Sequence, residues 1–163
     1  MPNEKNYKDY INEIQDFPKE GVSFKDISPL LAHPTKFKLA MQDMIQNVPY
    51  SCYGWAGVES RGFLIATGLS QLNDGGIVMI RKSGKLPPPV TSYGYKTEYS
   101  QDTLEIKEGS GTAIVVDDVL ATGGTLQVVN DIAELAGYKV LNNLVLIDLK
   151  YVPRVDWFKL NIE

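Results

Sequence analysis

The fold is decided by residues 113–125, AIVVDDVLATGGT, in which an apolar run meets two acids and then a glycine-rich turn. The stretch Thr112–Val116 is apolar after its first residue, as expected for a strand buried on both faces of a parallel sheet. Asp117 and Asp118 follow at its carboxyl end, where open α/β sheets bind their ligands. A helix is expected to begin at about Thr125.

The turn after the two acids, Ala121–Thr125, is predicted to bind a phosphate group. Free backbone N–H groups and the positive end of the helix dipole make the start of a helix an anion site. Gly123 and Gly124 allow positive φ and a close approach of phosphate oxygens, while Thr122 and Thr125 add hydroxyl donors. Because the neighbouring carboxylates can accept hydrogen bonds from ribose hydroxyls, the pattern indicates a site for a ribose phosphate. The alternative is a solvated acidic turn followed by a helix cap.

The rest of the chain alternates predicted helices and strands around this segment. The expected helices are Tyr7–Ile14, Pro34–Asn47, Gly62–Leu72 and the one that begins at about Thr125, which Gly137 could cap. The further expected strands are Cys52–Val58, Gly76–Arg81 and Val140–Leu149, with Gly76–Arg81 buried. Repeated strand–helix–strand units imply parallel pairing with right-handed crossovers. We therefore expect an α/β fold, a doubly wound, mostly parallel sheet with flanking helices.

The sequence also predicts which residues of one helix are buried, one irregular stretch and the start of one helix. In the helix Gly62–Leu72, the residues expected to face inward are Leu64, Ile65, Leu69 and Leu72. The stretch Gly21–Pro29 is expected to be irregular and to end in a turn. His33 is expected to start a helix.

The segment Lys82–Ile106 does not fit the helical period. It contains Lys82 and Lys85, the three prolines Pro87–Pro89 and three tyrosines. We expect a mobile loop that leads into a two-stranded ribbon near Tyr93–Tyr99 and Thr103–Ile106. A long loop inside an α/β fold is typical of a lid or binding element, with a passive excursion as the alternative.

Length and composition describe an ordinary globular chain. The 163 residues correspond to about one domain, and 44% hydrophobic with 22% charged residues excludes disordered, collagen-like and coiled-coil proteins. The net charge of −4 argues against bulk nucleic-acid binding. No run approaches the roughly 20 apolar residues of a membrane span, and the N-terminus lacks the apolar core of a signal peptide. We expect a cytoplasmic protein in which Cys52, the single cysteine, is buried and reduced.

The motif at residues 113–125 resembles the phosphoribosyl pyrophosphate signature of type I phosphoribosyltransferases. Further stretches resemble the adenine phosphoribosyltransferase family in order and spacing. They are FPKEGVSFKDISP at 17–29, ESRGF at 59–63, RKSGKLP at 81–87, Glu98-Tyr99 and Leu104–Ile106. The resemblance covers about residues 10–150. It implies transfer of a 5-phosphoribosyl group from phosphoribosyl pyrophosphate to adenine, giving AMP and pyrophosphate, with Mg²⁺ and in a homodimer.

The resemblance also implies roles for individual residues. The residues implied to bind phosphoribosyl pyrophosphate are Ser60, Arg61, Gly62, Lys82, Lys85, Asp117, Asp118, Ala121, Thr122, Gly123, Gly124 and Thr125. Those implied to bind adenine are Val22, Ser23, Phe24 and Lys25. Those implied to take part in catalysis are Arg81, Glu98, Asp117 and Asp118, with Glu98 as the acid or base near the purine. Within one domain, 1–163, residues 1–33 would form a hood over the base and residues 82–106 a lid.

Several of these residues have a plainer alternative. Arg61 could form a surface ion pair, and Lys82 could belong to a solvated basic run. Phe24 could be an ordinary core residue, and Glu98 a solvated residue of the ribbon. No His, Cys and Asp residues have metal-ligand spacing, so Mg²⁺ is expected to bind mainly through substrate oxygens and water.

Two other functions stay open at this point. One is a phosphoribosyltransferase for a 6-oxo purine, which the stretches 21–29 and 81–85 argue against. The other is a non-catalytic purine or phosphoribosyl pyrophosphate sensor, although 163 residues leave no room for a separate DNA-binding domain. The C-terminal residues 151–163 depart most from the family, and Trp157 and Phe158 there are expected to be packed.

Overall fold

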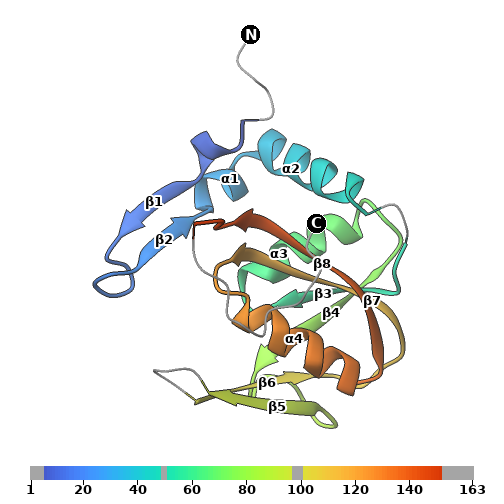
Figure 1. The fold of residues 1–163 in the computed structure, drawn as a ribbon. Coiled ribbons are helices and arrows are strands. Elements are labelled where there is room, and N and C mark those ends of the chain that lie inside the picture. Colours follow the sequence, from blue (N-terminus) through green and yellow to red (C-terminus); the bar gives the residue numbers. More distant parts are fainter. Residues whose placement is uncertain (1–5, 49–50, 97–100, 152–163) are drawn as a thin grey trace.

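The computed structural model describes residues 6–48, 51–96 and 101–151 (Figure 1). Its centre is a six-stranded sheet with the order β5-β6-β4-β3-β7-β8. The strands are β3 (Gly54–Val58), β4 (Gly76–Lys82), β5 (Thr91–Lys96), β6 (Gln101–Ile106), β7 (Gly111–Leu120) and β8 (Tyr138–Asp148). The pairs β3–β4, β3–β7 and β7–β8 are parallel, whereas β6 is antiparallel to both β4 and β5. The predicted mostly parallel sheet is confirmed.

Helices cover both faces of this sheet (Figure 1). They are α2 (Pro34–Gln46), α3 (Arg61–Ser70) and α4 (Gly124–Leu135). Strand β7 shows how the two faces are filled, because successive side chains of a strand point to opposite sides. Ala113 and Val115 pack with the residues of α4, and Ile114 and Val116 pack with those of α2 and α3. The sheet is therefore doubly wound, as the alternating elements predicted.

The N-terminal segment is a hairpin, and the predicted helix Tyr7–Ile14 is wrong. A short 3-10 helix, η1 (Lys8–Tyr10), precedes β1 (Asn12–Gln15), which pairs antiparallel with β2 (Ser23–Asp26) in a sheet of its own. The apolar spacing that suggested one helix is divided between two elements. Tyr7 and Tyr10 pack against the cluster of α2 and α3, while β1 is exposed along its whole length.

The stretch Gly21–Pro29 is also more regular than predicted. It contains β2 and the beginning of α1 (Ser28–Ala32). Gly21 adopts φ of +83°, and its N–H donates to Asp16 Oδ1 at 2.7 Å, so the hairpin turn is held by a side chain as well as by glycine. His33 is the N-cap of α2, where its Nδ1 accepts from Lys36 N, as expected for a helix start.

Two predictions of burial fail on one face of the sheet. Ile65 and Leu69 of α3 are fully buried, but Leu64 is 48% and Leu72 is 40% exposed. In β4, Ile80 is buried while Ile77 and Met79 are each 43% exposed. Helix α3 lies mainly over β3 and β7, so that this face of β4 stays open.

The predicted ribbon is part of the main sheet. Strands β5 and β6 form an antiparallel pair, and β6 continues the sheet by pairing with the end of β4, Ile80 with Ile106 and Lys82 with Leu104. Cys52 is buried, as predicted. Within the described ranges, every helix is too short or too polar to cross a bilayer.

Candidate active site

Strands β3 and β7 are neighbours in the sheet, and the helices that follow their carboxyl ends lie on opposite faces of it. From β3 the chain passes through α3 to β4, and from β7 it passes through α4 to β8 on the opposite face (Figure 1). Ligands of open α/β sheets bind at such a point. Both the two acids and the turn Ser60–Gly62 belong to these two strand ends.

Strand β7 is longer than predicted, so the two acids lie within it. It continues to Leu120 and pairs with β8 along this extension, Asp117 with Val145 and Val119 with Ile147. Polar residues can occupy the extension because β8 is equally long and supplies backbone partners. The predicted end at Val116 was placed too early.

The turn after β7 forms a small cavity at the start of α4. Gly123 is the N-cap of α4 with φ of +87°, a conformation that favours glycine, and Gly124 N donates to Thr122 Oγ1 at 3.3 Å. A cavity of about 80 Å³ is lined by Asp117, Val119, Leu120, Ala121, Thr122, Gly123, Thr125 and Leu126. The structure thus brings Asp117 and the predicted phosphate loop together around one space.

Asp117 and Asp118 lie in different environments, since neighbouring side chains of a strand point to opposite faces. Asp117 lines the cavity, and its Oδ1 accepts a hydrogen bond from Asp118 N at 2.8 Å. Asp118 is buried and forms an ion pair with Arg61 Nη2. Burial, together with the adjacent Asp118 carboxyl, raises the pKa of Asp117 to about 8. At neutral pH the free protein therefore holds a proton on Asp117, next to the ion pair of Asp118 with Arg61.

Arg61 connects the N-terminal hairpin to β7. Besides its ion pair with Asp118, its Nη1 donates to Lys25 O at 2.7 Å. Its guanidinium carbon lies 4.6 Å from the centre of the Phe24 ring, a cation–π contact. The residue predicted to bind pyrophosphate thus stands between the predicted adenine segment and the predicted ribose carboxylates. Its ion pair is half-buried, unlike the surface pair considered as the alternative.

The four residues predicted to bind adenine lie on or next to β2. Val22, Ser23, Phe24 and Lys25 are all half-buried. Phe24 packs edge-on against Phe17, with ring centres 5.1 Å apart, and belongs to neither core cluster. The alternative that Phe24 is an ordinary core residue is therefore not supported.

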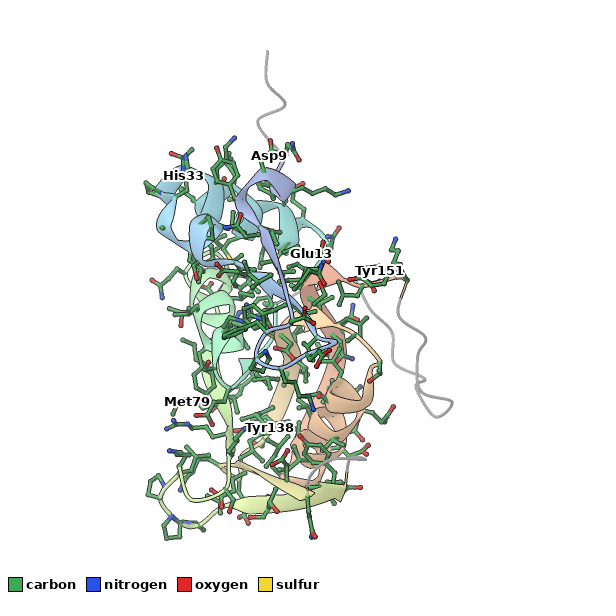
Figure 2. All side chains as sticks on the ribbon, turned by 90° about the vertical axis from the view of Figure 1, so that its left-hand side faces the viewer. Asp9, Glu13, His33, Met79, Tyr138 and Tyr151 are labelled. Carbon is green, nitrogen blue, oxygen red and sulfur yellow. The ribbon has the colours of Figure 1, made fainter. Side chains whose placement is uncertain are left out.

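Glu13, which the sequence analysis did not single out, holds this segment in place. Its Oε1 accepts from Ser23 Oγ at 2.5 Å and forms an ion pair with Lys25 Nζ at 2.8 Å. These partners hold the pKa of the Glu13 carboxyl below its ordinary value. The Lys25 ammonium also lies 5.8 Å from the centre of the Tyr151 ring, and Figure 2 shows Glu13 and Tyr151 at the same end of the molecule. Glu13 could have been found only by expecting β1, where it pairs directly with Lys25.

Gly62 allows the first turn of α3 to pack directly on β7. A Cβ at this position would lie 2.9 Å from the Val116 carbonyl oxygen and 3.6 Å from Asp117 Cα. A larger residue would push Arg61 and the turn Ser60–Gly62 away from the acids. The close approach explains why glycine follows Arg61.

The predicted basic residues lie on the neighbouring strand β4 and the loop after it. Arg81 Nη2 forms an ion pair with Glu59 Oε1 at 3.0 Å, directly beside Ser60. Lys82 and Lys85 are exposed and do not line the 80 Å³ cavity. The structure therefore places Arg81 beside the Ser60 turn and leaves both lysines outside the cavity of Asp117 and the turn Ala121–Thr125.

Some predicted residues lie outside the part of the chain that the structure describes. They are Glu98 and Tyr99, and Trp157 and Phe158 of the C-terminal segment. Among the described residues, no group of three or more His, Cys, Asp or Glu side chains is placed to hold a metal ion.

Comparison with known proteins identifies the family. Residues 40–151 match the phosphoribosyl transferase domain. An adenine phosphoribosyltransferase of Bdellovibrio bacteriovorus is 39% identical over 151 residues, 92% of each chain. One of Cenarchaeum symbiosum is 42% identical over 146 residues, 86% of each chain. This chain belongs to the adenine phosphoribosyltransferase family.

Solved structures of adenine phosphoribosyltransferases share its fold. The enzyme of Thermoanaerobacter pseudethanolicus superposes with a TM-score of 0.87 at 34% identity, covering 98% of this chain and 96% of that one. The enzyme of Saccharomyces cerevisiae, crystallised with adenine and an imino-altritol bisphosphate, gives 0.86 at 26% identity with the same coverage. The family resemblance of the sequence motifs is therefore confirmed over nearly the whole chain.

Proposed function

We propose that this chain transfers the 5-phosphoribosyl group of phosphoribosyl pyrophosphate to adenine, giving AMP and pyrophosphate, the purine salvage reaction of its family. The observation that carries the proposal is the cavity in which Asp117 faces the loop Ala121–Thr125 at the start of α4. A carboxyl beside a glycine-rich helix start offers one partner for ribose hydroxyls and another for a phosphate. Phe24 and Arg61 extend the site toward the N-terminal hairpin, where the base would bind.

The reaction we propose is displacement at the anomeric carbon through an oxocarbenium-like transition state. The loop Ala121–Thr125 binds the 5-phosphate, and Asp117 and Asp118 accept hydrogen bonds from the ribose 2- and 3-hydroxyls. Negative charge on this carboxyl pair also stabilises the positive charge that develops on the ribose ring. Catalysis then consists mainly of holding the two substrates in line and keeping water out.

Pyrophosphate would bind to the turn Ser60–Gly62 and to Arg61, with Lys82 and Lys85 adding positive charge. In the free protein Arg61 is paired with Asp118. The hydroxyls of the substrate would bind to Asp118 and its phosphate oxygens to Arg61. These contacts would replace the ion pair between the two residues. Glu98 accepts the imidazole proton that adenine loses when the new bond forms, an assignment that rests on the sequence motif.

Mg²⁺ fits this site as a companion of the substrate. The carboxylates of Asp117 and Asp118 are hard oxygen donors, but Asp118 already faces Arg61 and no larger acidic cluster is present among the described residues. We propose that phosphoribosyl pyrophosphate oxygens and water supply most of the ligands. When bound, the ion neutralises charge on the pyrophosphate leaving group.

We further propose that two copies of the chain associate through the open face of β4. Ile77 and Met79 are apolar and half-exposed there, and Figure 2 shows Met79 on the outer side of the sheet. An exposed apolar surface of this kind is typical of a protein–protein contact. Arg81 follows on the same strand, so the partner would approach the pyrophosphate side of the site.

The experiment that tests the function supplies one base at a time. The purified chain is incubated with Mg²⁺, phosphoribosyl pyrophosphate and either adenine, hypoxanthine, guanine or xanthine. AMP formed from adenine, with no product from the others, is the expected result. Turnover only with a 6-oxo purine would overturn the assignment of the base segment, and tight phosphoribosyl pyrophosphate binding without turnover would indicate a sensor.

A further inference from the structure

We propose that Glu105, a buried residue of β6 outside the substrate cavity, positions Lys82 and Lys85 for binding pyrophosphate. The inference rests on the proposed function and adds a positioning residue to it. Glu105 lies next to the loop of the predicted lid lysines in space, although it follows Lys82 by 23 and Lys85 by 20 residues in sequence. It touches none of the reacting groups that we have assigned.

The side chain of Glu105 accepts its hydrogen bonds from the loop that carries the lysines. Its side chain belongs to a residue that is 7% exposed, and it accepts from Ser83 Oγ at 2.9 Å and from Gly84 N at 3.0 Å. Hydrogen bonds from this loop, that of Gly84 N first, hold the pKa of the Glu105 carboxyl below its ordinary value. The carboxylate is therefore ionised and accepts hydrogen bonds from both N–H and O–H groups of one tight turn.

A second carboxylate fixes the other side of the same loop. Glu59 Oε2 accepts from Lys82 N at 2.8 Å, and its Oε1 is paired with Arg81. Ser83 N donates to Thr103 O at 2.9 Å, and Arg81 Nη1 donates to Lys85 O at 3.3 Å. The backbone from Arg81 to Lys85 is thus tied to the sheet along its length, while the lysine side chains are exposed.

This arrangement suits the binding of a polyanion. A lysine carries a point charge on a flexible side chain. Because its backbone is already held in place, less conformational entropy is lost when the anion binds. Glu105 can collect several donors at once because an ionised carboxylate only accepts hydrogen bonds. A glutamine has only one acceptor oxygen and no charge, so it would accept fewer and weaker hydrogen bonds from this loop, and the turn would loosen.

The test uses Glu105→Gln and Ser83→Ala, with Glu108→Gln as the control because Glu108 is exposed on the same stretch of chain. Amide hydrogen exchange of residues 83–86 in the free protein measures the positioning directly. Calorimetry then gives the affinities for pyrophosphate and for AMP. We expect about tenfold faster exchange and about tenfold weaker pyrophosphate binding in Glu105→Gln, a smaller effect in Ser83→Ala, and AMP affinity within about twofold.

The possible outcomes separate this inference from the proposed function. Unchanged exchange in a folded Glu105→Gln variant, or faster exchange with unchanged pyrophosphate affinity, would overturn the role of Glu105. Equal losses of pyrophosphate and AMP affinity would mean that Glu105 only stabilises the fold. Ser83→Ala keeps the carboxylate, and so it carries the test if Glu105→Gln does not fold. AMP formation by the unmodified chain is measured separately, and its failure would count against the function alone.

Discussion

Asp117 is the residue whose chemistry depends most on its surroundings. The proposed reaction uses it as a hydrogen-bond partner for a sugar, and the fold places it beside a second carboxyl in a buried position. Its pKa is therefore raised from the ordinary 3.8 to about 8. Between pH 3.8 and about 8, Asp117 therefore holds a proton in the folded protein that it has lost in the unfolded chain. The free energy of unfolding must then decrease as the pH rises through this window.

Asp117→Asn should remove this dependence. An amide does not titrate, so we expect a flatter stability profile between pH 5 and 8 and, at pH 8, a melting temperature about 2–4 °C above that of the unmodified chain. Thermal unfolding at several pH values measures this dependence, with the exposed Asp74→Asn as the control. Parallel pH profiles for Asp117→Asn and the unmodified chain would contradict the assigned pKa.

Replacing Asp117 and Asp118 together by Asn should weaken the binding of phosphoribosyl pyrophosphate, which calorimetry measures. An unchanged affinity of this double variant would contradict the proposed sugar-binding role.

Glu98 is the residue for which the sequence motif alone supports a catalytic role. Glu98→Gln should slow the chemical step by roughly 10²-fold or more, because the variant lacks the carboxylate that accepts the imidazole proton of adenine. Phosphoribosyl pyrophosphate affinity should stay the same, since that substrate binds to other residues. Rapid-quench single-turnover measurements decide the question, and a rate equal to that of the unmodified chain would remove the role.

At the scale of the elements, helix α4 is joined to β8 by a buried pair of amides. Asn130 and Asn143 are 7% and 2% exposed, and each donates to the side-chain oxygen of the other. Asn130 also donates to Leu126 O at 2.8 Å. The pair therefore orients the helix whose first turn forms the phosphate loop.

Removing one member of the pair leaves an amide buried without its partner. Asn130→Leu and Asn143→Leu should each lower the free energy of unfolding by about 1–3 kcal/mol, and Asn130→Leu/Asn143→Leu should regain much of that loss because neither polar group remains. Urea unfolding of both single variants and the double variant forms a double-mutant cycle. Strictly additive losses would show that the two amides do not interact.

Sequence periodicity predicted the elements whose faces pack on the sheet. The apolar run before Asp117 and the helix Pro34–Asn47 were both recognised because burial imposes their periods. The hairpin of β1 and β2 was missed because β1 buries none of its residues, so its pairing leaves no apolar pattern. The cavity formed by Asp117 and the turn Ala121–Thr125 could be anticipated because the acids and the glycines are contiguous in the sequence.

Contacts between distant residues could not be predicted in this way. Glu59 meets Arg81 across 22 residues, and Glu105 meets Ser83 across the same separation. Nothing local in the sequence distinguishes these carboxylates from solvated ones. Their role follows from the way β4 lies between β3 and β6.

At the scale of the whole molecule, the open face of β4 leads to a prediction about assembly. Ile77→Asp/Met79→Asp should separate the proposed dimer, since two charges would have to be buried without partners. Leu135→Asp is the matched control, because Leu135 is also exposed but lies at the end of α4. Sedimentation velocity should show monomers for the first variant and dimers for the second. A monomeric unmodified chain, or a dimer that survives both charges, would contradict the proposed interface.

The division of the strands into two sheets has a consequence for how such a protein can change over time. The hairpin of β1 and β2 shares no backbone pairing with the six-stranded sheet, and the side chain of Arg61 is one bridge between them. Mutations within residues 12–26 can therefore reshape the proposed acceptor site without disturbing the register of the strands that carry the proposed sugar-phosphate site. The architecture leaves the acceptor free to diversify while the donor stays constant.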